Sequence, residues 1–439
     1  MKTHLYMIRY PRLSSTDRIY KTNISEKGIE NICEYLVKHM SKNHREFSIK
    51  ILPGTIPGQV RDTTHGNYRI LSYDPSILSF DNEDAKLYTS VVVDTEETKI
   101  VAYAMPKPQE LNTLEANLTD EYHFEEMIEG TMLNLFYNRG KWEIATRNAV
   151  GGNYWFYRTQ YDMASGNPSP KKRQTTFLEM FVEALGYEKS TPLNEVSFLS
   201  ELDTAYSYSF ILQHPENHIV QTFAFPHIYL VGVFKIDAGN TVTQIPPKEF
   251  QQWKVFQNAT MPIEFPRIWE SASYGKDSYD KSKTEILAKC DMGVFLVCDK
   301  TGNRAIIENA NYARLKELRG NNPNLQYQFL CMHYIGRVNE FLEHFPMYKY
   351  QFHRFMKQYN DFVAQVQDTY YKYYVLKLRE KMPKKYFIHA AAIHHAVYIP
   401  SIKPYSETGK IVVTKRVVDE YFKKIEPQKV LYYLNYLEE

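Results

Sequence analysis

The stretch "EEMIEGTMLNLFY", Glu125–Tyr137, places three acidic residues and a methionine before a glycine and an apolar run. A glycine followed by apolar and aromatic residues is typical of a tight turn that enters a β-strand. Segments of this shape often carry a nucleophile where Met127 stands, but a thioether has no titratable proton. Two interpretations follow: an ordinary turn between strands, or a site that has lost its nucleophile.

Length and composition are those of a globular chain with room for about two to four domains. Of its 439 residues, 24% are charged and 44% are apolar. The 36 tyrosines predict either a core rich in amphipathic rings or surfaces on which bases stack. The cysteines lie far apart, which predicts reduced thiols: Cys33, Cys290, Cys298 and Cys331. No apolar run reaches the roughly 18 residues of a membrane helix, and the N-terminus lacks a signal-peptide core. We therefore expect a cytoplasmic protein with no membrane partner.

The hydrophobic pattern predicts an α+β body followed by an all-helical tail. Segments rich in β-branched and aromatic residues alternate with Asp, Asn and Pro, and a hairpin turn is expected at residues 138–140. Helices are predicted within residues 24–42 and over 175–186, and a loop over 165–174. From residue 321 the helical pattern dominates, and basic residues outnumber acidic ones there by 17 to 11.

Several motifs, in order, resemble the phage-type RNA ligases (RNA ligase 1 family) of the covalent nucleotidyltransferase superfamily. They lie within residues 65–320 and include "MIEGTMLNLF", "EIATRNAVGG", "YSFILQHPENHIV", "CDMGVFLVCD" and "RAIIENANYARLKELRG". The resemblance implies a nucleotidyltransferase fold with antiparallel sheets and an all-α C-terminal domain. The implied division is residues 1–75 as an N-terminal α/β region, 76–320 as the ligase-like domain, and 321–439 as the helical domain.

The family's chemistry needs a lysine that forms a phosphoramidate with AMP, carboxylates that bind ribose or Mg²⁺, and two lysines beside the phosphates. The corresponding positions in this chain are Met127, Glu129, Ile211, Met292, Ile306 and Glu308, and Thr89 replaces an early arginine. Residues with architectural roles are kept, namely Gly130, Pro215, Asn217, Gly293 and Tyr312. We therefore expect no catalytic residue, no metal and no cofactor, in a pseudoenzyme that binds RNA or scaffolds a complex of transcription or RNA processing.

Two alternatives stay open from the sequence. The first is an active ligase using ATP and Mg²⁺ with a relocated nucleophile, for which Lys107 and Lys141 are the nearest candidates. If a nucleotide still binds, the resemblance assigns it to Lys107, Glu129 and Arg147. The second alternative is a structural subunit of a transcription or virion assembly. A viral origin fits the family, in which case the protein would act in the cytoplasm of a host cell.

The segment "YYKYYVLKLREKMPKK", residues 370–385, interleaves six basic residues with four tyrosines. Cations beside aromatic rings are what sequence-tolerant RNA binding requires, although the segment could equally be the solvated face of an amphipathic helix. The predicted RNA-binding residues are Lys372, Lys377, Arg379, Lys381, Lys384 and Lys385. Nearby, His389, His394 and His395 have a spacing that does not suit a metal site.

Overall fold

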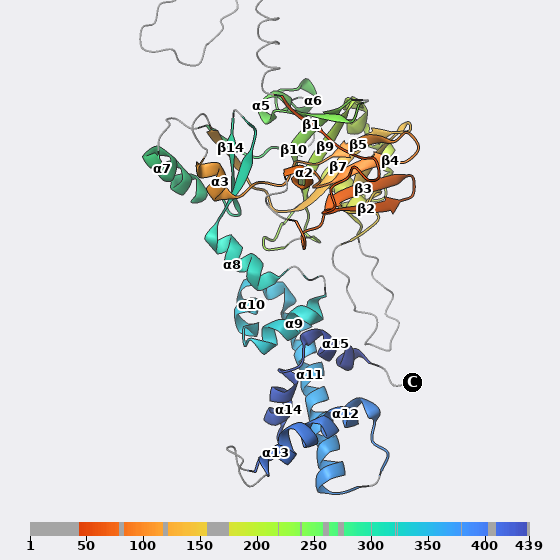
Figure 1. Ribbon diagram of the computed structural model, residues 1–439, viewed down its shortest axis with the longest axis vertical. Coiled ribbons are helices and arrows are strands. Elements are labelled where there is room, and N and C mark those ends of the chain that lie inside the picture. The colour runs from red at the N-terminus through yellow and green to blue at the C-terminus, as the bar shows by residue number, and fades with distance from the viewer. Residues whose placement is uncertain are drawn as a thin grey trace, which may run out of the picture. The chain divides into compact units, whose positions relative to one another are not determined.

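The computed structural model describes residues 44–439 with the exception of 79–82, 117–121, 156–174, 218, 238, 258–262, 271–275, 300, 321, 323, 379, 403–409 and 437–439 (Figure 1). The predicted helix within 24–42, the loop over 165–174, Cys33 and Arg379 lie outside the described residues. Among the helices that are described, none is long and apolar enough to cross a membrane.

The largest sheet has seven strands, six of them in the order β1-β11-β10-β9-β7-β8, with β12 paired to β10. The strands are β1 (Arg45–Ser48), β7 (Thr131–Asn138), β8 (Lys141–Ala145), β9 (Tyr206–Gln213), β10 (His227–Ile236), β11 (Thr241–Ile245) and β12 (Ile263–Glu264). All pairings are antiparallel except that of β10 with β12. Apolar residues of β7, β9 and β10 pack against α4 (Phe177–Ala184), α5 (Pro247–Phe250) and α6 (Lys254–Gln257).

Helix α4 lies within the range 175–186 that the sequence predicts, and both of its ends are capped. Thr176 caps its N-terminus in a capping box with Glu179, which satisfies two backbone donors that a helix otherwise leaves free. At the other end, Gly186 has a positive φ of 84°, a conformation that stops the helix without strain in glycine.

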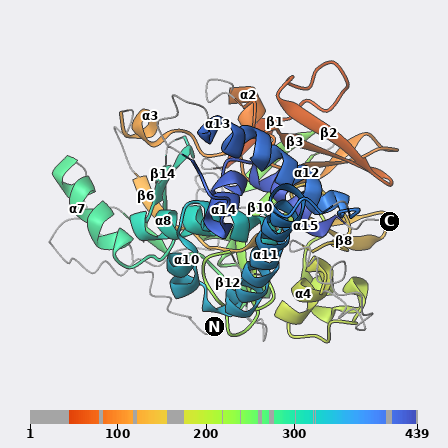
Figure 2. The same ribbon diagram turned by 90° about the horizontal axis from the view of Figure 1, so that it is seen from below.

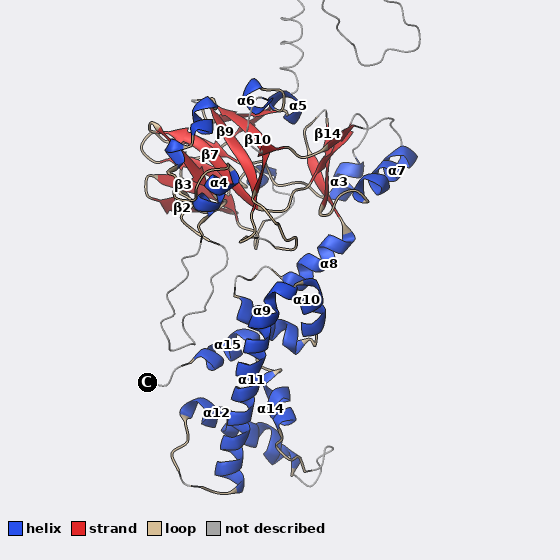
Figure 3. Cartoon of the chain, turned by 180° about the vertical axis from the view of Figure 1, so that it is seen from behind, coloured by secondary structure: helices blue, strands red, loops and turns tan. Residues whose placement is uncertain are grey.

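A second, four-stranded sheet packs face to face on the first. Its antiparallel strands are β2 (Val60–His65), β3 (Tyr68–Tyr73), β4 (Val91–Asp94) and β5 (Lys99–Tyr103), in that order. The short helix α2 (Glu83–Lys86) lies between β3 and β4 in the chain. Tyr103 of β5 and Phe234 of β10 share one buried core between the two sheets. This strand-rich region appears in red in Figure 3.

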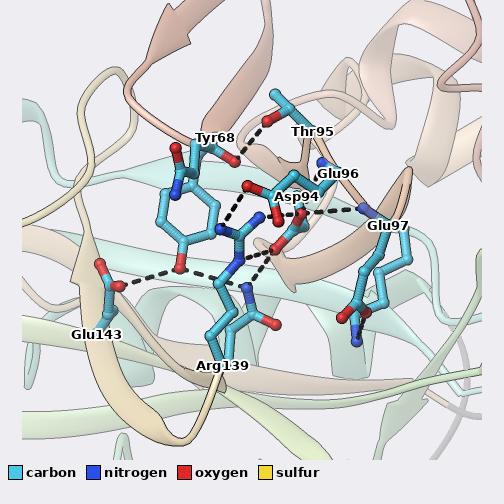
Figure 4. A network of polar contacts seen from close by, with 10 residues as sticks. Tyr68, Asp94, Thr95, Glu96, Glu97, Arg139 and Glu143 are labelled. Carbon is cyan, nitrogen blue, oxygen red and sulfur yellow. Dashed lines mark hydrogen bonds and ion pairs between the residues drawn. The ribbon is translucent and has the colours of Figure 1, made fainter.

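Two hairpin ends of these sheets are fastened by a polar network (Figure 4). The fully buried Asp94 accepts hydrogen bonds from Asn138 and from both Nε and Nη2 of Arg139, at 2.6–2.8 Å. Tyr68 donates to Glu143 at 3.0 Å. Because Asp94 lies on β4 and Arg139 in the β7–β8 turn, the network ties the second sheet to the first.

A third sheet contains the first two residues of the stretch with which the sequence analysis began, whereas its apolar run forms β7 of the first sheet. It has the order β13-β6-β14-β15, with β6 (Tyr122–Glu126), β13 (Ile268–Glu270), β14 (Gly293–Cys298) and β15 (Arg304–Glu308). Phe124, Val294 and Leu296 face a core with α3 (Leu111–Ala116) and α7 (Lys276–Leu287). The opposite face of the same strands therefore holds residues 123, 125 and 127 of the β6 segment and 304, 306 and 308 of β15.

The C-terminal region is helical, as predicted (Figures 1 and 2). Its α-helices are α8 (Ala310–Arg319), α9 (Leu325–Tyr334), α10 (Val338–His344), α11 (Lys349–Tyr370), α12 (Lys384–Ile393), α13 (Ile399–Ser401), α14 (Lys415–Phe422) and α15 (Pro427–Asn435). Helix α8 lies before residue 321, where the helical region was predicted to begin. Helix α11 packs against α12 and α14 through Phe362, Ala390 and Phe422. The α+β class, the antiparallel sheets and the helical region are confirmed, whereas the domain boundaries at 75 and 320 stay predictions.

Candidate functional site

Met127 lies where β6 leaves the third sheet. Its N–H donates to the carbonyl of Gly293 at 3.0 Å, which holds the segment after β6 beside the start of β14. The residue is buried, with 8% of its surface exposed. This backbone hydrogen bond therefore places Met127, where the nucleophile is expected, beside Met292, where a metal-binding carboxylate is expected.

The two retained glycines of this region are required by close backbone approach. A Cβ at Gly130, where φ is +154°, would lie 2.4 Å from the carbonyl oxygen of Leu212. A Cβ at Gly293, where φ is +135°, would lie 2.3 Å from the carbonyl oxygen of Ile307. Both values are far below a van der Waals contact, so each glycine sets how closely two strands pass.

Glu129 is an internal anchor for a neighbouring loop. Its Oε1 accepts hydrogen bonds from the backbone N–H groups of Ile219, Val220 and Gln221 at 2.8–3.1 Å, and its residue surface is 2% exposed. Tyr312 also donates to it, and burial together with this carboxylate raises the pKa of that phenol well above its usual value. The carboxylate that the sequence assigned to a nucleotide is thus engaged within the protein.

The other expected catalytic positions lie on or beside the same strands. Ile211 on β9 and Met292 before β14 are half-buried, and Ile306 on β15 is 40% exposed. Glu308 forms an ion pair with Lys316 of α8 at 3.0 Å. Ile211, Met292 and Ile306 offer neither a charge nor a metal-binding oxygen, and Glu308 has a negative charge where the resemblance expects a positive one.

Lys107 and Arg147 are brought together by one aromatic ring. The guanidinium carbon of Arg147 lies 4.1 Å from the ring centroid of Tyr73, and Nζ of Lys107 lies 5.1 Å from it. Burial, followed by the charges of Arg147 and Lys86, lowers the pKa of Lys107. Of the three residues that the sequence assigned to a nucleotide, two therefore form a positively charged pair.

A basic pocket opens next to this pair and was missed by the sequence analysis. Four of its eight lining residues are basic and none is acidic: Arg45, Lys86, Lys107 and Arg304. They are spread over some 260 positions of the chain, which is why no local charge run marks the pocket. One signal was present, since Arg304 precedes Ile306 by two residues and so shares its face of β15.

A buried histidine on the same face of the third sheet is clamped between carboxylates. His123 of β6 contacts Asp299 through Nδ1 and Glu125 through Nε2, the second at 3.0 Å. Burial alone would lower the pKa of His123, but hydrogen bonds to the two carboxylates outweigh it and raise the pKa to about 9. His123 is therefore a cation at neutral pH, paired with acids that were not singled out in the sequence.

Comparison with known proteins agrees with the resemblance carried by the motifs. An RNA ligase of Rhodothermus phage RM378 is 27% identical to this chain over 124 residues. This chain is a distant relative of that phage RNA ligase. The match covers 28% of this chain and a quarter of the length of the phage protein. No family model matches the chain.

Solved structures of RNA ligases are among the structural neighbours. An archaeal ATP-dependent RNA ligase has a TM-score of 0.37 at 13% identity, over 73% of this chain and 71% of the neighbour. An RNA ligase of Naegleria gruberi has a TM-score of 0.30 at 11% identity, over 61% and 84% of the two chains. The antiparallel sheets and the helical C-terminal region of this relative of the phage enzyme are those that its motifs implied.

The predicted RNA-binding residues of the tail are only partly available to a ligand. The segment ends α11 in a π-helical turn (Tyr371–Val375) and continues as a connection to α12, so it is not one continuous helix. Lys377, Lys381 and Lys384 are exposed. In contrast, Lys372 pairs with Asp368 at 2.7 Å, and Lys385 donates to the carbonyl oxygens of Leu434 and Tyr436.

The tail histidines are embedded among aromatic rings. His389 lies in the core between α12 and α14, edge-on to Phe422 and Tyr433, and burial lowers its pKa to about 4. His394 stacks on Tyr374 with ring centroids 3.8 Å apart. Within the described part of the chain, no group of three or more His, Cys, Asp or Glu side chains is arranged to hold a metal ion.

Proposed function

We propose that this chain is an RNA-ligase-like protein of the phage type that has lost nucleotidyl transfer and binds RNA in the cytoplasm. One observation carries the proposal. The positions of the nucleophile, of the metal carboxylate and of one phosphate-binding lysine hold Met127, Met292 and Ile306, while Glu129 is satisfied by the backbone of residues 219–221.

The chemistry explains why these changes act together. Forming a phosphoramidate needs an amine that attacks the α-phosphate, and a metal ion with lysines to neutralise the charge that develops on the phosphates. Two thioethers and one aliphatic side chain supply none of these. They also spare the protein the cost of burying catalytic charges that lack a ligand. RNA binding needs none of this machinery, because phosphate contacts from surface cations suffice.

One observation favours an active ligase with a relocated nucleophile. Burial and neighbouring cations lower the pKa of Lys107, which raises the neutral fraction of its amine, as a nucleophilic lysine requires. Lys141, the other candidate, is paired with Glu143 at 2.9 Å. Against this alternative, the carboxylates that would hold Mg²⁺ are missing at positions 211 and 292.

Incubation with labelled ATP and Mg²⁺, followed by a denaturing gel, separates the two. We expect no covalent AMP adduct on the wild-type chain. The matched variants are Lys107→Gln and Lys141→Gln. An adduct that disappears in Lys107→Gln and persists in Lys141→Gln would establish the relocated nucleophile and refute the pseudoenzyme.

RNA binding is tested separately, by fluorescence anisotropy with a labelled oligoribonucleotide at several salt concentrations. We expect binding whose logarithm falls linearly with the logarithm of the salt concentration, as phosphate contacts dictate. A chain that retains no RNA at low salt would instead support the role of a scaffold in a transcription or virion assembly.

A further inference from the structure

The outer edge of β2 is open in the described part of the chain. β2 is the first strand of the four-stranded sheet, so only β3 pairs with it, and it lies at the margin of that sheet in Figures 1 and 2. Apart from the ladder with β3, no hydrogen bond to the backbone of residues 61–65 is found among the described residues. A strand edge of this kind presents N–H and C=O groups that can pair with another strand.

Two other edge strands of this protein are blocked by side chains. At β8, the side-chain amide of Asn194 accepts from the N–H of Trp142 at 2.6 Å and donates to the carbonyl of the same residue at 3.2 Å. At β5, Oδ1 of Asn240 accepts from the N–H of Ile100 at 2.9 Å. Such contacts occupy groups that a further strand would need, so β2 differs from β5 and β8 in being available.

The charged residues of β2 are neutralised within its own hairpin. Nε of Arg61 donates to the carboxylate of Asp74 at 2.7 Å, and Asp62 pairs with Arg69 of β3. Lysine and proline commonly protect an edge strand from pairing, and the segment "VRDTTHG", residues 60–66, contains neither. Its exposed centre is two threonines, which favour β-strands. The sequence of β2 therefore permits pairing with a further strand.

We propose that the edge of β2 binds a second copy of this chain. Two β2 strands related by a twofold axis would run antiparallel and join the four-stranded sheets of the two copies edge to edge. The contact is self-complementary, because each copy supplies the backbone donors and acceptors that the edge of the other requires. The inference concerns a surface outside the candidate site and is independent of the proposed function.

The side chains of β2 favour one register for this pair. Opposed side chains of an antiparallel pair share a face of the sheet, so the twofold axis must pass through a residue rather than between two residues. An axis at Asp62 would place two carboxylates opposite each other, which destabilises a pair. An axis at Thr63 instead places Asp62 opposite Thr64 of the second copy, and Arg61 opposite His65. An axis farther along the strand would shorten the ladder.

The length of the strand predicts a weak dimer. β2 has six residues, and residues 61–64 are exposed, so little side-chain surface is available to be buried between two copies. Stable protein interfaces bury roughly 1,200–2,000 Å² in total, and a ladder of this length buries less. We therefore expect monomers and dimers in exchange, with a dissociation constant on the order of 10–100 μM.

Sedimentation velocity at increasing protein concentration tests the self-association. The wild-type chain is expected to shift from the monomer mass of 51.8 kDa toward twice that mass as the concentration rises. Thr64→Glu should weaken the dimer roughly fivefold, because it sets a second carboxylate opposite Asp62 at two symmetric positions. Thr284→Glu adds the same charge at an exposed threonine of α7 and should leave the dimer unchanged.

A cysteine at the proposed axis tests the register directly. Opposed residues of an antiparallel pair have Cα atoms about 4.5–5.5 Å apart, a separation that a disulfide can span. With oxidised glutathione as the oxidant, Thr63→Cys is therefore expected to form a covalent dimer on a non-reducing gel. Thr284→Cys and the wild-type chain, which retain the natural cysteines, should remain monomeric on the same gel.

Two results would overturn the proposal. A wild-type chain that stays monomeric up to several hundred micromolar, with no cross-link in Thr63→Cys, excludes a second copy and leaves an extended peptide of another protein as the occupant of the edge. A dimer that Thr64→Glu does not weaken, and that Thr63→Cys does not cross-link, must form through another surface. Thermal unfolding of each variant under reducing conditions verifies that it is folded, and none of these outcomes depends on RNA binding.

Discussion

At the scale of single residues, the candidate site contains two kinds of position: those where catalytic side chains are expected, and those that determine the path of the backbone. In the proposed function, Met127 and Met292 stand where chemically active groups are expected, whereas Gly130 and Gly293 are required because a Cβ at either position would meet a carbonyl oxygen. Glu129 belongs to the second kind, because its carboxylate holds the backbone of a loop. It supplies acceptors to three consecutive N–H groups that would otherwise be unpaired.

Glu129→Gln should destabilise the protein. A glutamine keeps one acceptor oxygen but loses the charge, and its amide nitrogen would face backbone donors, which predicts a loss of about 1–3 kcal/mol in the free energy of unfolding. Urea unfolding measures it. The control is Glu308→Gln, whose ion pair with Lys316 lies near the surface and should contribute less than about 1 kcal/mol. Similar losses in both variants would contradict the anchoring role.

The sequence predicted the position of this residue and missed its partner. The turn at Gly130 is visible locally, because a glycine precedes a β-rich run. The loop that Glu129 holds comes some 90 residues later, and no local pattern links the two. The same limit hid the contact between His123 and Asp299, which are 176 residues apart.

At the scale of elements, buried ion pairs fasten strands that are remote in the sequence. His123 and Asp299 join β6 to the end of β14, and Asp94 and Arg139 join β4 to the β7–β8 turn. When a change of pH neutralises one member of such a pair, the other is left as a buried, unpaired charge. The stability of the strand association therefore depends on pH.

The His123 pair predicts a loss of stability at alkaline pH. The folded-state pKa, about 9, is above the ordinary value of 6.5, so the contribution is complete below about pH 6.5 and disappears as the pH rises through 9. This contribution is at most about 3 kcal/mol. Unfolding free energies of wild type and His123→Gln, measured between these pH values, should converge as the pH rises. A constant difference between the two would refute the assignment.

The Asp94 network predicts the opposite pH dependence. The guanidinium of Arg139 holds the pKa of Asp94 well below its ordinary value, more than offsetting the effect of burial. Its contribution is therefore complete above about pH 4 and is lost as the pH falls further. Asp94→Asn should cost about 2 kcal/mol or more at pH 7 and unfold with a weaker dependence on acid. Asp84→Asn, at an exposed pair with Lys50, is the matched control, and equal acid sensitivity of the two variants would be the contrary result.

At the scale of the whole molecule, the sequence predicted the elements better than their assembly. The hairpin at 138–140, helix α4 and the helical C-terminal region follow from local turn chemistry, capping and periodicity. Helix α7 (Lys276–Leu287) was not predicted, because its sequence "KDSYDKSKTEIL" is mostly polar. The basic pocket required the tertiary fold, since each of its cations looks isolated along the chain.

The exposed lysines of the helical tail are predicted to contact RNA, and their contribution to binding can be measured. Replacing Lys377, Lys381 and Lys384 by glutamine should weaken RNA binding and lower its salt slope by roughly one per lysine in contact. The control replaces three other exposed lysines of the helical region, Lys410, Lys415 and Lys424. An unchanged salt slope in the first variant would mean that the three tail lysines are solvent-exposed but make no contact with RNA.

The glycines at 130 and 293 also bear on protein engineering. They set how closely the segments pass that carry positions 127, 211, 292, 306 and 308, so on the proposed function the rebuilding of a catalytic centre here would begin with new side chains at these positions. If the proposed function holds, the chain is a starting point for directed evolution of a ligase. Libraries confined to those five codons would sample activity on a backbone that already has the necessary turns.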